Sequence, residues 1–284
     1  ARDMRDTFSS KLVELAQSNP QVLLLTGDHG YGLFNSLRKA QPRQFINMGI
    51  AEQNMVGVAA GLSRVGFKPI VYGLSAFIPI RVLEQIKLDV CHDNLPIIFI
   101  GDGAGFVYSH LGTSHQSTED IAVTRAIPNL IVMSPGDRFE LSRCIDLAYA
   151  SNLPVYLRLG KADRGAVHSK SLDFNLGDLI FLKKPADLSS SATLVVTGSM
   201  LKMATILCER FPSLGLVSAP SLKPINEEQI KDMCLNNHTI ITLEEHSIFR
   251  GLGSIISDVA ATLGHATVKK LGIQDRFSEH CGSY

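Results

Sequence analysis

The chain has 284 residues, of which 45% are hydrophobic and 19% are charged, and 27 basic side chains balance 27 acidic ones. This length exceeds one ordinary core and favours two domains. No basic run or acidic tail concentrates charge, so we expect no nucleic-acid partner and no membrane-surface partner. No apolar stretch reaches the roughly 18–20 residues of a membrane helix. The five cysteines are scattered without a CxxC spacing, which predicts a cytoplasmic protein without a disulfide framework or zinc site.

The first part of the chain alternates short apolar runs with helical patterns, which is typical of parallel α/β architecture. The apolar runs are rich in Val, Ile and Leu with little alternation, as in strands that are covered on both faces. The predicted strands are 21–26, 44–48, 69–73, 96–101, 130–134 and 154–158. The predicted helices are 5–17, 51–65, 81–92, 118–126 and 138–150. These elements define a first domain over residues 1–165.

A polar stretch then interrupts the alternation, and we interpret residues 166–190 as a linker to a second unit. The second domain, residues 191–284, restarts the pattern. Its predicted strands are 193–198, 214–219, 239–244 and 266–269, and its predicted helices are 201–211, 226–235 and one that opens at Gly251. We therefore expect an α/β protein of two domains, each an open, mostly parallel sheet flanked by helices.

Polar residues and glycines gather where the predicted strands of the first domain end. Ligands collect at the carboxyl ends of strands in open parallel sheets, because loops and helix N-termini converge there. The segments at these ends are 27–30, 49–53, 74–80, 101–116 and Arg158. Their concentration at one edge of the predicted sheet indicates a binding site.

One of these segments, Gly49-Ile50-Ala51-Glu52-Gln53, resembles the glutamate-bearing turn of the pyrimidine-binding domain in thiamine-diphosphate enzymes. The likeness continues in order along nearly the whole chain, through Phe77, 112–116, 125–129, 135–137, 223–225, 243–246 and 251–253. The chain thus resembles the C-terminal section of a split transketolase, with its pyrimidine-binding and C-terminal domains. The β subunits of 2-oxoacid dehydrogenases and 1-deoxyxylulose-5-phosphate synthases share these segments, so both stay open as alternatives, as does a catalytically silent subunit.

The resemblance implies a cofactor site in the first domain. Glu52 would be catalytic: its carboxyl would hydrogen-bond the aminopyrimidine ring and favour the tautomer that removes the thiazolium proton. The alternative is an ordinary acid at a helix N-terminus. Phe77 would stack on the pyrimidine, with Leu74 and Ile80 at i−3 and i+3. Asp28 would face the thiazolium, although it also fits a simple turn.

The resemblance also implies substrate-binding residues. His115 would move protons to and from sugar hydroxyls, and His110 would lie within reach. Arg158 would hold the sugar phosphate, its alternative being an ordinary surface arginine. Transketolases usually carry Asp where this chain has Leu111, and a phosphate-contacting His where it has Gly101-Asp102-Gly103. A modified or branched sugar phosphate therefore stays open beside a pentose phosphate.

Gly101-Asp102-Gly103 followed by Asn129 fits the GDG…N pattern of thiamine-diphosphate magnesium sites. We reject this reading because that motif belongs to the other domain of the family, so we expect no metal ligand in this chain. Thiamine diphosphate would bridge two chains, with Mg²⁺ and the diphosphate held mainly by a separate N-terminal-section subunit. The expected assembly is a heterotetramer that transfers a two-carbon ketol unit between sugar phosphates.

Overall fold

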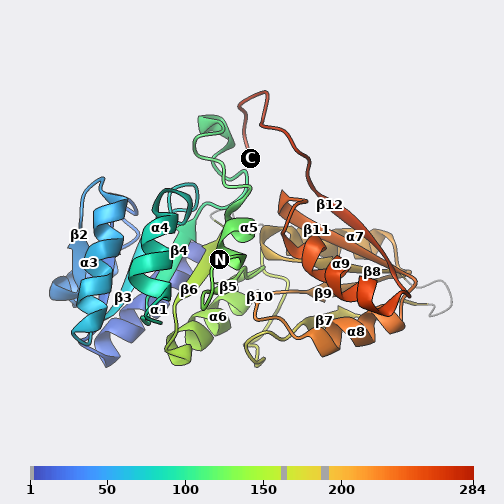
Figure 1. Cartoon of the computed structure of the whole chain (residues 1–284), viewed down its shortest axis with the longest axis horizontal. Coiled ribbons are helices and arrows are strands. Elements are labelled where there is room, and N and C mark those ends of the chain that lie inside the picture. The colour runs from blue at the N-terminus through green and yellow to red at the C-terminus, as the bar shows by residue number, and fades with distance from the viewer. Residues whose placement is uncertain (1–2, 161–164, 187–191) are drawn as a thin grey trace.

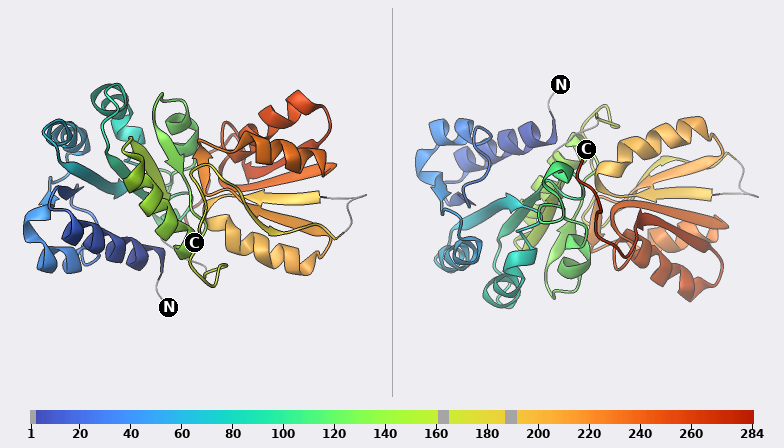
Figure 2. Two further views of the ribbon diagram at one scale, coloured as in Figure 1. Left: turned by 90° about the horizontal axis from the view of Figure 1, so that it is seen from below. Right: turned by 90° about the horizontal axis from the view of Figure 1, so that it is seen from above.

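The computed structural model describes residues 3–160, 165–186 and 192–284. Two β-sheets lie side by side along the long axis of the molecule, the first mostly from the N-terminal half of the chain and the second from the C-terminal half (Figure 1). Helices cover both faces of each sheet (Figure 2). The predicted α/β class, with two mostly parallel sheets flanked by helices, is confirmed.

The first sheet has seven strands in the order β10-β5-β6-β4-β3-β1-β2, and all neighbours are parallel except β10 and β5. The strands are β1 (Val22–Thr26), β2 (Phe45–Asn47), β3 (Lys68–Leu74), β4 (Ile98–Asp102), β5 (Ile131–Met133), β6 (Val155–Leu159) and β10 (Ser221–Lys223). Alternate residues of β1 serve opposite cores, since Leu23 and Leu25 pack in one hydrophobic cluster and Val22 and Leu24 in the other. This double burial explains the apolar runs without alternation.

The helices are α1 (Met4–Ser18), α2 (Asn35–Ala40), α3 (Glu52–Arg64), α4 (Leu83–Gln85), α5 (Asp120–Arg125), α6 (Arg138–Ser151), α7 (Leu201–Arg210), α8 (Glu227–Leu235) and α9 (Leu252–Leu263). Side-chain caps set the starts of three of them, for Asp3, Asp137 and Asn226 each accept a backbone N–H of the first turn. A π-helix at Ile86–Cys91 continues α4. No helix in the described ranges is long and apolar enough to cross a membrane.

The second sheet has five strands in the order β12-β11-β8-β9-β7. They are β7 (Ile180–Lys183), β8 (Ala192–Val196), β9 (Leu214–Ser218), β11 (Thr239–Ser247) and β12 (Thr267–Ile273). β7 runs antiparallel to β9 and lies inside the stretch that we predicted as a linker. β7 is a short edge strand of four residues that is only partly buried, and its place in the sheet is set by its pairing with β9. The short β10 likewise comes from the second half of the chain but pairs with β5 of the first sheet.

Candidate active site

Glu52 is the first residue of α3, directly beyond the carboxyl end of β2. Its side chain is only 4% exposed, and its Oε1 accepts a hydrogen bond from Arg81 Nη1 at 3.1 Å. Within the described ranges, this is the one hydrogen bond of the Glu52 side chain. The fold therefore places a carboxyl that is shielded from water at the predicted edge of the sheet.

Phe77 lies in the turn that follows β3, where its backbone N–H bonds to the carbonyl of Leu74 at 2.8 Å. Arg81 covers the ring, with its Cζ 4.1 Å from the ring centroid. The rings of His29 and His115 lie 6.0 Å and 5.3 Å from that of Phe77. Two segments that are distant in sequence, those of His29 and His115, thus join Arg81 around one aromatic ring.

Leu74 and Ile80 flank this ring in the chain. Leu74 ends β3 and is buried, while Ile80 begins a short 3-10 turn and is half-buried. Their contact with a cofactor stays a prediction.

Asp28 follows β1 on the rim of the same edge and is exposed. Its φ of 63° is left-handed, a conformation that Asp tolerates better than most residues. The backbone N–H of Asp28 donates to Asn47 Oδ1, and Asn47 Nδ2 donates back to Asp28 Oδ1, both at 3.2 Å. These bonds give Asp28 a role in the turn, whatever else it does.

His29 and Arg81 are site residues that sequence reasoning missed. Burial lowers the pKa of His29, although the negative charges of Glu52 and Asp28 oppose the shift, so the site favours the neutral imidazole. Arg81 comes four residues after Phe77, one helical turn along, which is the spacing that brings two side chains together. This spacing is the sequence signal that could have identified Arg81 as a site residue.

His115 belongs to a loop that we call the His115 loop (residues 106–116). Reciprocal backbone hydrogen bonds of 2.8 Å and 3.0 Å between Gly105 and Ser117 close its base. His115 is half-buried, with Nδ1 2.9 Å from Ser114 Oγ. His110 is exposed in a 3-10 turn of the loop, and Leu111 next to it is 46% exposed. The loop therefore presents His115 toward Phe77 and leaves Leu111 near the surface.

Arg158 lies at the carboxyl end of β6, as predicted, but its side chain is buried. Its side chain is 3% exposed, and its Nε donates to Asp120 Oδ2 at 2.8 Å. Its Nη2 donates to the carbonyls of Ser117 and Glu245, the latter in the second domain. Burial alone would raise the pKa of Asp120, but the guanidinium outweighs it and holds that pKa below its usual value. This placement excludes an ordinary surface arginine and gives Arg158 a structural role between the two sheets, while phosphate binding by Arg158 stays a prediction.

The two ends of the GDG…N pattern do not share a site. Asp102 ends β4 at the carboxyl edge of the sheet, where its Oδ2 accepts from Tyr72 Oη at 2.6 Å. Asn129 precedes β5, at the amino edge, and donates to the carbonyl of Cys91. Strands β4, β6 and β5 are parallel, so these edges are opposite. Among the described residues, no three His, Cys, Asp or Glu side chains are grouped to hold a metal.

Two helix-flanked sheets, with a shielded carboxyl and an aromatic ring at the carboxyl edge of the first, define a two-domain α/β protein. Residues 1–165 match the family described as "Transketolase, pyrimidine binding domain", and residues 186–282 match "Transketolase, C-terminal domain". The chain belongs to the transketolase family, as its sequence predicted.

Known proteins support this assignment. An apulose-4-phosphate transketolase subunit of Phocaeicola vulgatus is 32% identical over 282 residues, which cover 99% of this chain and 90% of that protein. A solved structure described as a split gene transketolase, inactive beta4 tetramer, is 33% identical with a TM-score of 0.87, covering 96% of this chain and 90% of the other. The 1-deoxy-D-xylulose-5-phosphate synthase of Gloeothece citriformis is 32% identical, but this chain spans only 44% of its length.

Proposed function

We propose that this chain is the pyrimidine-binding subunit of a thiamine-diphosphate-dependent transketolase. It acts with a separate subunit that holds the diphosphate and Mg²⁺, and together they transfer a two-carbon ketol unit between sugar phosphates. The observation that carries the proposal is the shielded carboxyl of Glu52, which Arg81 links to the ring of Phe77, at the edge of the sheet where such ligands bind.

The Glu52 carboxyl fits the aminopyrimidine ring. One of its oxygens binds Arg81, and the part of the chain that the structure describes offers no side-chain partner to the other. A carboxyl in this setting is suited to hydrogen-bond a ring nitrogen. When bound, thiamine diphosphate supplies a nucleophilic carbon at its thiazolium ring.

The aromatic and imidazole side chains divide the remaining tasks. Phe77 provides a flat face for the pyrimidine, and Leu74 and Ile80 exclude water around it. His115 holds or moves a proton at a hydroxyl of the sugar, because imidazole changes charge near neutral pH. Asp28, at the rim, lies near the expected place of the thiazolium, and exposed His110 lies near the path of the sugar.

The need for a partner rests on the ligands that a diphosphate and its metal require. We place these on the second subunit and expect a heterotetramer with two copies of each chain. Two relatives support this: the protein from Phocaeicola vulgatus is described as one subunit of a transketolase, and the solved structure is described as a split gene transketolase in an inactive beta4 tetramer. The sugar stays open, and the first of these relatives is named for apulose 4-phosphate. The cytoplasmic location stays a prediction of the sequence.

The decisive experiment compares Glu52→Gln with the wild-type chain, each reconstituted with the diphosphate-binding subunit, thiamine diphosphate and Mg²⁺. Two-carbon transfer from xylulose 5-phosphate or apulose 4-phosphate to an aldose phosphate should fall at least about 100-fold, because the carboxyl no longer moves a proton. Glu209→Gln, an exposed acid on α7, is the matched control and should leave the rate unchanged. Full activity of Glu52→Gln contradicts the proposal and supports a silent subunit.

The same reconstituted complex distinguishes the transketolase from the two alternative enzymes by the substrates that it consumes. Consumption of pyruvate with a triose phosphate indicates a 1-deoxyxylulose-5-phosphate synthase, and pyruvate oxidation that depends on a lipoyl partner indicates a dehydrogenase β subunit. Transfer between sugar phosphates with no turnover of pyruvate supports the transketolase.

A further inference from the structure

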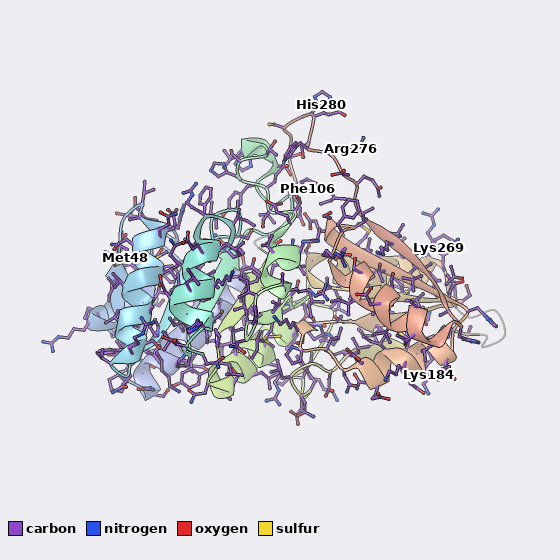
Figure 3. All side chains as sticks on the ribbon, in the orientation of Figure 1. Met48, Phe106, Lys184, Lys269, Arg276 and His280 are labelled. Carbon is purple, nitrogen blue, oxygen red and sulfur yellow. The ribbon has the colours of Figure 1, made fainter. Side chains whose placement is uncertain are left out.

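The last described residues leave the second domain and return to the first. After β12, a segment that we call the tail (residues 274–284) arches back toward the His115 loop (Figures 1 and 2). In Figure 3, Arg276 and His280 on the tail stand above Phe106, the first residue of that loop. The tail is largely exposed, so its course depends on a few specific contacts.

Two of these contacts fall on the loop itself. Ser278 Oγ donates to Gln116 Oε1 at 2.6 Å, and the receiving Gln116 is only 6% exposed, directly after His115 in the chain. Near the tip of the loop, a Cβ added to Gly112 would lie 3.1 Å from Cys281 Sγ. The tail therefore lies against two parts of the loop, its C-terminal end at Gln116 and its tip at Gly112.

The third contact runs through Glu245, which is 7% exposed at the end of β11. Its Oε1 accepts from the backbone N–H of Phe106 at 2.7 Å, and its Oε2 accepts from Ser199 Oγ at 2.5 Å and Tyr284 Oη at 2.8 Å. One carboxylate thus joins the start of the loop, the second domain and the tail. A charged acceptor makes stronger hydrogen bonds than a neutral one, so this is the firmest point of the arrangement.

Val107 in the loop is buried and the ring of Tyr108 packs against Gly103, but the outer part, residues 110–114, is largely exposed. Its exposed residues include His110, Leu111, Thr113 and Ser114, and the described hydrogen bonds between Phe106, Ser109 and Gly112 stay within the loop. Loops with few buried contacts open easily and lose the placement of their side chains. The distance between His115 and Phe77 therefore depends on what fastens the outer side of the loop.

We propose that the tail is a strap that positions His115, with Ser278 and Tyr284 as positioning residues for the substrate side of the site. Only one part of this proposal, the role of His115 at the substrate, rests on the proposed function. The contacts described for the tail fall on the His115 loop and Glu245, whereas the pyrimidine side is built by α3 and the turn after β3. The strap therefore acts on sugar binding and turnover and leaves the affinity for thiamine diphosphate unchanged.

The test is the pair Ser278→Ala and Tyr284→Phe, singly and together, with Ser283→Ala as the matched control on the same segment. Hydrogen exchange of peptides from residues 106–116 is followed in the full chain and in the reconstituted complex. Loss of both bonds should speed exchange in this loop about tenfold or more, and the control should not. In the complex, the KM for the donor sugar should rise several-fold, while the Kd for thiamine diphosphate stays within about twofold of wild type.

Unchanged exchange in the double variant overturns the strap, because the loop then holds its place without the tail. Faster exchange with an unchanged KM and kcat overturns the positioning of His115. A weaker Kd for thiamine diphosphate also overturns the proposal, because the tail would then act on the cofactor side. If the proposed function is wrong, the wild-type complex shows no ketol transfer. The hydrogen-exchange data still test whether the tail holds the His115 loop in place.

Discussion

Arg81 and Glu52 form an ion pair across 3.1 Å, although 29 residues separate them in the chain and their exposures differ widely. The Glu52 side chain is 4% exposed and the Arg81 side chain is 45% exposed. The ion pair therefore links a buried carboxylate to a guanidinium at the protein surface. Arg81 also covers Phe77, so it touches both residues that we assign to the pyrimidine.

Replacing Arg81 by Met should lower the free energy of unfolding by about 1–2 kcal/mol, because a shielded carboxylate loses its hydrogen-bonded partner. Arg81→Lys keeps the charge but lacks the planar fork and should recover part of the loss. Urea unfolding of the single variants, Glu52→Gln and the double variant measures the coupling. Additive effects of Arg81→Met and Glu52→Gln would show that the ion pair contributes nothing to stability.

Replacing Phe77 by Ala should raise the apparent Kd for thiamine diphosphate in the complex about 3–10-fold, because the pyrimidine loses its stacking face. Phe211→Ala is the control, since this half-exposed ring lies at the end of α7 in the second domain. Calorimetric titration of the complex measures both. Equal affinities for wild type and Phe77→Ala would remove Phe77 from the cofactor site.

Replacing Arg158 by Met should cost about 3–5 kcal/mol of unfolding free energy, because it strands the charge of Asp120 inside the protein. Replacing both partners, as Asp120→Leu with Arg158→Met, should recover much of that loss. Urea unfolding separates the two roles of Arg158: a structural arginine changes stability, and a phosphate-binding arginine changes the KM for the sugar at unchanged stability.

The linker should respond to pH through His168, whose Nε2 lies 3.0 Å from Glu140 Oε1. Burial alone would lower the pKa of His168, but the hydrogen bond and charge of Glu140 outweigh it and raise that pKa above its ordinary 6.5. The folded chain therefore binds this proton more tightly than the unfolded chain. The contribution to stability is complete below about pH 6.5 and is lost as the pH rises through the raised value.

His168→Gln should remove this part of the pH dependence, so its stability should change less than that of wild type when the pH rises above 6.5. Urea unfolding at several pH values, with exposed His92→Gln as the control, measures the difference. Identical pH profiles for wild type and His168→Gln would show that the Glu140 pair does not couple to folding.

Much of this architecture was predictable because it is local. Runs such as 21–26 and 96–101 are apolar since they are covered on both faces, and such runs identify strands without knowledge of their neighbours. The ordered motifs around Glu52 and Phe77 predicted the family. Short edge strands escaped this reasoning, because β7 and β10 have neither length nor periodicity and are defined by partners elsewhere in the chain.

The sequence by itself determined the order of the elements, the edge at which the site lies and the position of Glu52 at the start of a helix. Only the tertiary structure decided which side chains meet there. It brought Arg81 and His29 to Phe77, buried Arg158 against Asp120, and laid Ser278 on Gln116, which is 162 residues away in the chain. Periodicity records which face of an element is buried, whereas hydrogen bonds and ion pairs between distant residues depend on how the sheets and loops are packed together.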